Sequence, residues 1–261
     1  MSRIFAVLLL AAVSTGCLRS TTVVTLRPDG SGTIVQETGV SPQAMAMLKG
    51  MAQSGSGEPP TGLFDEAQAQ KMADSMGVRF LSGEPVKTAQ LEGYRARFAF
   101  DDVQKLQMNM SQKAAAALGG GRADSAGDPP FGFGFERKGD SAVLTITMPE
   151  EKPSDLVGLG GQMGGADASP EQNAQAIQMM KMMMQGLFVD ISLEIDGRII
   201  KTNAPHVEGS RLTLLQLDFD KLLADAASLE RLQGAADLKG LRDIPGLKVI
   251  TDRQVTVEFA K

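Results

Sequence analysis

The chain of 261 residues carries 26 basic and 31 acidic side chains, a formal net charge of −5, and 43% of its residues are hydrophobic. This is enough for one large domain or two small ones with a buried core. An acidic chain is poorly suited to binding nucleic acid, and charge would not draw it to anionic lipid headgroups. With one cysteine and one histidine, the chain cannot form an internal disulfide and has too few ligands for an ordinary zinc site.

The first 17 residues have the pattern of a secretory signal. Arg3 precedes an apolar run from Ile4 to Val13, which is about half the roughly 20 residues that a helix needs to cross a bilayer. Ser14-Thr15-Gly16 then leads directly to Cys17. This arrangement resembles the lipobox of bacterial lipoproteins, with Ser14 at a position where that family usually has Leu or Val.

The lipobox resemblance implies that residues 1–16 are a signal peptide that is removed. It also implies that Cys17 carries a covalent diacylglycerol and an N-linked acyl chain such as palmitate. Residues 17–21 would then be the lipidated cysteine and a short tether, at most about 17 Å long. Acylation also accounts for an unpaired cysteine in an oxidising envelope. The alternative is an uncleaved N-terminus with a buried free thiol.

The same resemblance predicts the location of the protein. In a Gram-negative organism, Leu18 after the cysteine resembles the sorting pattern of outer-membrane lipoproteins that face the periplasm. In an organism with one membrane, the protein would lie on the outer face of the plasma membrane.

Runs of β-branched residues and apolar–polar alternation predict strands throughout the chain. Turn residues join neighbouring strands as hairpins at Pro28–Gly32, Gly139-Asp140 and Asp196-Gly197. Gly83-Glu84-Pro85 is expected to separate two short strands. The predicted strands are 21–27, 33–38, 78–81, 86–91, 94–100, 131–135, 142–148, 188–195, 198–202, 211–217, 247–250 and 255–259.

Capping residues predict helices between these strands. The expected starts are Ser41-Pro42, Asp65, Asp102 (with a helix reaching about Leu118), Ser169-Pro170, Asp218 and Ser228. Strands outnumber helices, and the chain has no βαβ alternation. We therefore predict an α+β fold with a mainly antiparallel sheet built from hairpins and with inserted amphipathic helices.

Six segments follow one another in a recognisable order: Pro28-Asp29-Gly30, Gly93–Val103, Phe135–Gly139, Val189–Ile195, Thr202-Asn203 and Leu212–Leu217. This order resembles the LppM-type domain of bacterial lipoproteins. The resemblance implies an α+β domain over residues 22–223 in an envelope lipoprotein, with no catalytic residue to carry over. Residues 224–261 are expected to add a helical segment and closing strands packed on the same body.

The residues provide little for catalysis or nucleotide binding, and we predict a protein that is not an enzyme. Nucleophilic catalysis needs a nucleophile beside a positioned base, and the one histidine, His206, follows Pro205 in a predicted turn. The glycine-rich run Gly158–Gly165 lacks the Lys-Ser/Thr of a phosphate-binding loop. We expect neither nucleic acid nor a nucleotide as a partner, and no cofactor beyond the acyl groups on Cys17.

Two apolar clusters are candidates for a binding surface. The predicted helix after Ser169 carries a stripe of Ile177, Met179, Met180, Met183 and Met184. This stripe could be ordinary core, a surface for a lipid or a partner, or a thioether site for Cu(I). Phe131, Phe133 and Phe135 share one face of a strand and are either core or part of the same surface.

Taken together, these patterns predict a non-enzymatic, membrane-anchored envelope lipoprotein. Its expected role is binding or scaffolding at the membrane surface, with a lipid, another hydrophobic ligand or an envelope protein as its partner. The methionine-bearing helices and glycine-rich loops would form a mobile cover over an apolar sheet face. The alternative function is Cu(I) handling in the periplasm through methionine sulfur.

Overall fold

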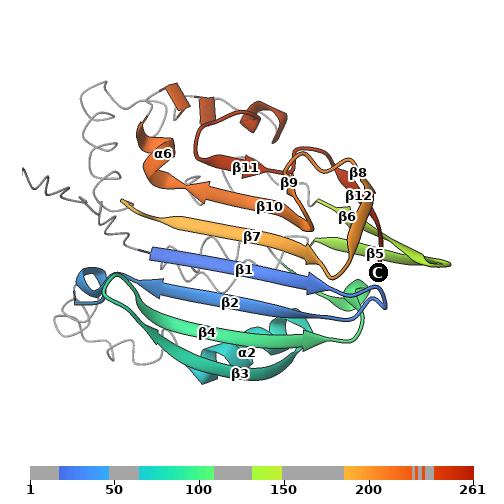
Figure 1. Cartoon of the computed structure of the whole chain (residues 1–261). Coiled ribbons are helices and arrows are strands. Elements are labelled where there is room, and N and C mark those ends of the chain that lie inside the picture. The colour runs from blue at the N-terminus through green and yellow to red at the C-terminus, as the bar shows by residue number, and fades with distance from the viewer. Residues whose placement is uncertain are drawn as a thin grey trace, which may run out of the picture.

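The computed structural model describes residues 18–46, 65–108, 131–148, 185–224, 227–228, 231–232 and 238–261. They form two β-sheets with a few short helices (Figure 1). A helix also begins after Ser41, whose hydroxyl oxygen accepts the amide hydrogen of Ala44 at 3.2 Å. The elements are β1 (Leu18–Leu26), β2 (Gly32–Val40), α2 (Glu66–Met76), β3 (Arg79–Lys87), β4 (Glu92–Phe100), η1 (Val103–Lys105), β5 (Gly132–Lys138), β6 (Ser141–Thr147), β7 (Phe188–Ile195), β8 (Arg198–Thr202), β9 (Val207–Glu208), β10 (Arg211–Asp218), α6 (Phe219–Ala224), η2 (Leu238–Leu241), β11 (Leu247–Val249) and β12 (Gln254–Ala260).

The large sheet has the strand order β11-β10-β7-β1-β2-β4-β3, with β9 paired to β10. Its described neighbours are antiparallel except β1 and β7, which run parallel. The small sheet, β5-β6-β12-β8, is antiparallel throughout. The predicted fold class is therefore confirmed as a mainly β protein with mostly antiparallel sheets and few short helices.

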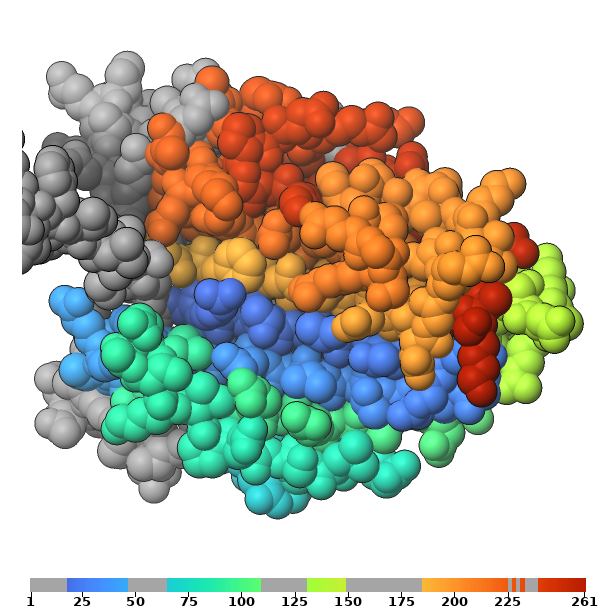
Figure 2. Space-filling view, in the orientation of Figure 1, coloured from blue at the N-terminus to red at the C-terminus, as the bar shows by residue number. Residues whose placement is uncertain are grey.

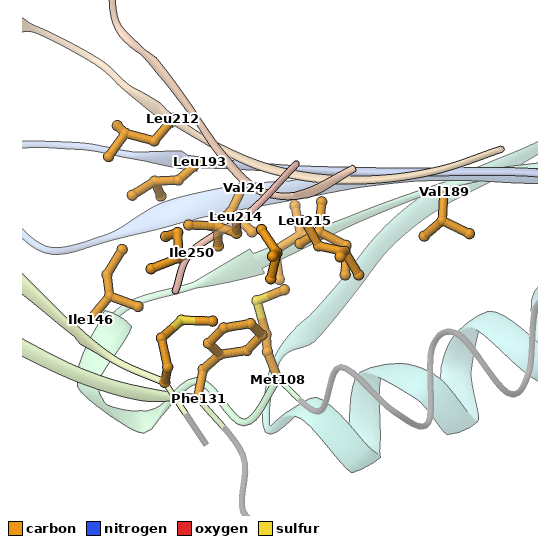
Figure 3. Packing of buried hydrophobic residues seen from close by; sticks show 14 of the residues in the cluster. Val24, Met108, Phe131, Ile146, Val189, Leu193, Leu212, Leu214, Leu215 and Ile250 are labelled. Atoms are coloured by element: carbon orange, nitrogen blue, oxygen red, sulfur yellow. The ribbon is translucent and has the colours of Figure 1, made fainter. Parts of the chain in front are cut away.

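One apolar row shows how the strands build the core. Phe98, Ile34, Val24, Leu193 and Leu212 lie opposite one another across β4, β2, β1, β7 and β10, and none is more than 1% exposed. Alternation places these side chains on one face of every strand. Figure 3 shows part of this row together with side chains from the small sheet. We call this covered side the inner face of the large sheet, and the opposite side its outer face.

The predicted hairpins β1–β2 and β5–β6 are confirmed, as is the helix cap at Asp65, whose carboxylate accepts the Gln68 amide hydrogen at 2.9 Å. The prediction for residues 78–91 was wrong, because β3 runs unbroken through Gly83 and Pro85. β3 is the last strand of the large sheet, and a proline is tolerated at an edge where its missing N–H faces no neighbouring strand.

Two further predictions were wrong over the described residues. The α-helix expected directly after Asp102 is a single 3₁₀ turn, η1, and Leu106 has already returned to an extended backbone. The rest of that predicted helix, residues 109–118, lies outside the described residues. Asp196-Gly197 does not close a hairpin, because β7 pairs within the large sheet and β8 pairs with β12 in the small one. These two residues instead carry the chain from one sheet to the other.

Candidate functional site

The first described residue, Leu18, follows Cys17 directly and is already part of a strand. Leu18 is the first residue of β1 and lies opposite Val40 of β2, while Arg19 lies opposite Phe188 of β7. Residues 18–21, expected to belong to a tether, are therefore strand. Cys17 itself lies outside the described residues.

We call the end of the large sheet where β1 starts the Leu18 end. The strand register also places there the last residue of β2, the first residue of β4 and the turn between β3 and β4. The start of β7 and the end of β10 lie at the same end, since Phe188 is opposite Asp218. α6 continues from there, and the carboxylate of its residue Asp220 accepts the Gly186 amide hydrogen at 2.7 Å.

An exposed cation and an aromatic ring meet at the Leu18 end on the outer face. The guanidinium carbon of Arg19 lies 4.8 Å from the ring centre of half-buried Phe188, a geometry in which the ring quadrupole attracts the cation. Nearby, Lys221 pairs with Asp218 at 2.8 Å. This end therefore combines an amphipathic Arg–Phe pair with a local ion pair of balanced charge.

The three phenylalanines proposed from sequence lie in or against the core. Phe131 and Phe133 are 2% and 8% exposed, and their ring centres are 6.2 Å apart. Phe135 is half-buried, 6.5 Å from Phe259, and it packs over Gly30. This placement fits the core interpretation of the three rings.

The methionine stripe of Ile177, Met179, Met180, Met183 and Met184 lies outside the described residues. The described chain resumes at Gln185, just before β7 begins at the Leu18 end.

A charge network crosses the outer face of β2, β4 and β3. Arg95 donates from Nε and Nη2 to Glu37 Oε2 at 2.9 and 2.7 Å, and from Nη1 to Glu84 Oε1 at 3.2 Å. The hydrogen bonds and charge of Glu37 raise the pKa of Arg95 above its usual value. Beside this network lies a shallow hollow of about 280 Å³, lined by Ser82, Gly83, Glu84, Arg95 and Arg97. Arg95 and Arg97 alternate along β4, which is green in Figure 2, and therefore share a face, but only the strand register reveals the partners of Arg95 across the sheet.

A second ion pair on the outer face is more deeply buried. Arg211 Nη2 donates to Asp190 Oδ1 at 2.7 Å, and Gln216 Nε2 donates to Oδ2 at 3.4 Å. Arg211 lies opposite Glu194, two residues beyond Ser192, so its side chain must run along β7 past Ser192 to reach Asp190. Ser192 is fully buried on the same face, and no hydrogen-bond partner for its Oγ is found among the described residues.

The inner face contains a polar patch on β1 and β2. Ser20 Oγ lies 3.2 Å from Thr38 Oγ1, and Gln36 Nε2 donates to the same Thr38 oxygen at 3.4 Å. Thr22, opposite Gln36, is 1% exposed. Gln36 Oε1 is buried, and no hydrogen-bond partner for it is found among the described residues.

The opposite end of the large sheet, which we call the far end, carries the turn between β1 and β2. Arg137 of β5 donates to the Asp29 carbonyl oxygen at 2.9 Å, which places the β5–β6 turn beside it. A hydrogen bond from the Ser31 hydroxyl, 2.6 Å, and another from its amide lower the pKa of the Asp29 carboxyl. A polar hollow of about 250 Å³ lies here, lined by Pro28, Asp29, Arg137, Gly139, Asp140 and Ser141.

His206 is half-buried and follows Pro205 before β9. Burial, followed by the charge of Lys248, lowers its pKa. In the part of the chain that the structure describes, no three His, Cys, Asp or Glu residues come together as metal ligands. Within that same part, no helix has the length and apolar character required to cross a membrane.

No protein-family model matches the chain, and no curated protein matches it. Among solved structures, the chain is similar to the NMR structure of the folded domain of the Mycobacterium tuberculosis LppM protein. The two share 10% sequence identity with a TM-score of 0.36, and the match covers 94% of this chain and 90% of the other.

Proposed function

We propose that this protein is lipid-anchored in a bacterial cell envelope and that its body acts without catalysis, by binding or scaffolding at the membrane surface. The observation that carries the proposal is the lipobox-like sequence Ser14-Thr15-Gly16-Cys17, followed immediately by a paired strand. An acylated Cys17 would attach a folded sheet to the bilayer with no intervening segment.

The partner that we propose is a lipid, another hydrophobic ligand or an envelope protein. The proposed contact is the methionine stripe of Ile177, Met179, Met180, Met183 and Met184, because methionine side chains adapt to apolar partners of different shape. The described chain resumes at Gln185, directly after this segment, at the Leu18 end. Phe131 and Phe133 no longer belong to the proposed surface, since both rings are buried.

Mass spectrometry of the full chain, purified from the membranes of a bacterial host, tests both parts. Under denaturing conditions we expect a chain that begins at Cys17 and carries the added mass of a diacylglycerol. A Cys17→Ser variant should lack that mass. A free Cys17 thiol that reacts with maleimide in the purified wild-type protein would contradict the anchor.

Native mass spectra of the same preparation test the ligand. We expect a non-covalent lipid mass on the wild type that is lost when Met179, Met180, Met183 and Met184 are replaced by Gln. Lys181→Gln, on the opposite side of the predicted helix, is the matched control and should retain the ligand. A wild-type spectrum without added mass would contradict the hydrophobic-ligand part of the proposal.

A further inference from the structure

We propose that the Leu18 end of the large sheet is a membrane-contact surface, so that the body stands end-on upon the bilayer and the far end projects into the aqueous compartment. This orientation rests on the proposed acylation of Cys17. The acylation alone does not say which surface of the body meets the lipid headgroups, and the orientation names that surface.

The first argument is the length of the connection. Consecutive Cα atoms are about 3.8 Å apart, so an anchor on Cys17 is one residue from Leu18. β1 is held by β2 on one side and by β7 on the other from its first two residues onward, so no slack segment lets the sheet swing away. The nine residues of β1 span about 25–30 Å, which is the distance that separates the far end from the anchor.

The second argument is the composition of two exposed turns at the Leu18 end. The β3–β4 turn presents Thr88, Ala89 and Gln90, which are exposed and uncharged, and Pro42 and Gln43 after β2 are likewise exposed and uncharged. The neighbouring strand ends and α6 carry three charges of each sign, namely Arg19, Lys87, Lys221, Glu92, Asp218 and Asp220. Because removing charged groups from water is costly, the two uncharged turns are the parts of this end that can approach a headgroup layer at the lowest cost.

The third argument is the pairing of Arg19 with Phe188. Arginine can lay its aliphatic chain along apolar surface while its guanidinium stays in water, and aromatic rings favour the membrane interface. Arg19 is two residues from Cys17, and Phe188 lies opposite it at the start of β7. The other charges on the strand ends and α6 here are mixed in sign, and Lys221 pairs with Asp218 at 2.8 Å. The contact should therefore need no anionic lipid.

Single cysteines labelled with an environment-sensitive fluorophore test the orientation, because an acylated Cys17 leaves the chain without another thiol. Ala89→Cys reports on the Leu18 end and Asp140→Cys on the far end, and both positions are exposed. In phosphatidylcholine vesicles containing a lipid with a nitroxide on its headgroup, we expect several-fold stronger quenching at residue 89 than at residue 140. Equal quenching, or stronger quenching at residue 140, would overturn the end-on orientation.

A linker variant tests whether the short connection causes the orientation. Ten Gly and Ser residues inserted between Cys17 and Leu18 give a flexible tether with a typical end-to-end length of about 16–19 Å. We expect the contrast between the two labels to fall sharply while the acylated mass is retained. An unchanged contrast would overturn the role of the direct connection. A fluorophore on Cys17 itself would show that the anchor proposal, not the orientation, has failed.

Discussion

Asp190 is the most deeply buried carboxylate among the ion pairs that the described residues form, with 6% of its side chain exposed. Its partner Arg211 is 43% exposed. By contrast, Arg79 and Asp101 are 3.9 Å apart with 64% and 96% of their side chains exposed. A charge left without its partner in a buried position is costly, whereas an exposed pair contributes little. These two ion pairs should therefore differ in what they contribute to stability.

Replacing Arg211 by Ala should lower the free energy of unfolding by about 2–3 kcal/mol, somewhat less than for a fully buried pair because Arg211 is partly in water. Urea unfolding of the purified protein measures this change. Arg79→Ala is the matched control and should change the free energy by less than about 0.5 kcal/mol. An Arg211→Ala variant as stable as the Arg79→Ala variant would contradict the assigned role of the pair.

The strand β3 shows which features of a single element can be predicted from the sequence and which cannot. Gly83 and Pro85 were expected to end a strand, and locally both residues disfavour one. In the structure Gly83 lies beside Tyr94 of β4, and a side chain on residue 83 would overlap the tyrosine ring. The glycine thus provides room for a cross-strand aromatic contact, and the edge position tolerates the proline. Neither circumstance is visible without the neighbouring strand.

Gly83→Ala should therefore lower the free energy of unfolding by about 1–2 kcal/mol, because the Tyr94 ring must move. In a Tyr94→Ala background, Gly83→Ala should leave the free energy of unfolding nearly unchanged, since the overlapping ring atoms are absent. A double-mutant cycle measured by urea unfolding gives the coupling between the two positions. Equal costs of Gly83→Ala in both backgrounds would show that the ring does not require the glycine.

Two elements that depend on short-range signals were predicted correctly. The β1–β2 hairpin follows from Pro28–Gly32, and the start of α2 follows from Asp65 with its acceptor oxygen three residues before Gln68. Directly after Asp102, residues 103–108 do not form the expected α-helix, although Asp102 does accept the Gln104 amide hydrogen at 3.0 Å. A cap shows where a turn starts, but tertiary packing decides how far a helix continues.

The arrangement of the whole molecule depends on pairings between distant segments. β1 pairs with β7 in parallel across some 170 residues of chain, and no local pattern specifies that neighbour. Asp196-Gly197 has the composition of a two-residue hairpin turn. However, β7 is already paired with β1 on one edge and with β10 on the other. The following strand therefore enters the small sheet. Of the candidate site, the sequence indicates Cys17 and the methionine stripe, which both lie outside the described residues. It does not indicate the Leu18 end, which is assembled from strands that meet only in the folded sheet.

A substitution at Gly197 tests how closely the chain is held where it crosses from the large sheet to the small one. A Cβ atom there would overlap the carbonyl oxygen of Ala260 in β12, and backbone cannot rotate away as a side chain can. Gly197→Ala should lower the free energy of unfolding by about 1–3 kcal/mol by forcing the two segments apart. Gly134→Ala, in β5 of the same small sheet, is the control, because its Cβ would lie 3.5 Å from Thr145, an ordinary contact. Gly134→Ala should leave the free energy of unfolding unchanged or raise it by up to about 1 kcal/mol, because alanine lowers the conformational entropy of the unfolded chain. If urea unfolding gave both variants the same stability, the crossover would not hold the sheets as closely as the structure indicates.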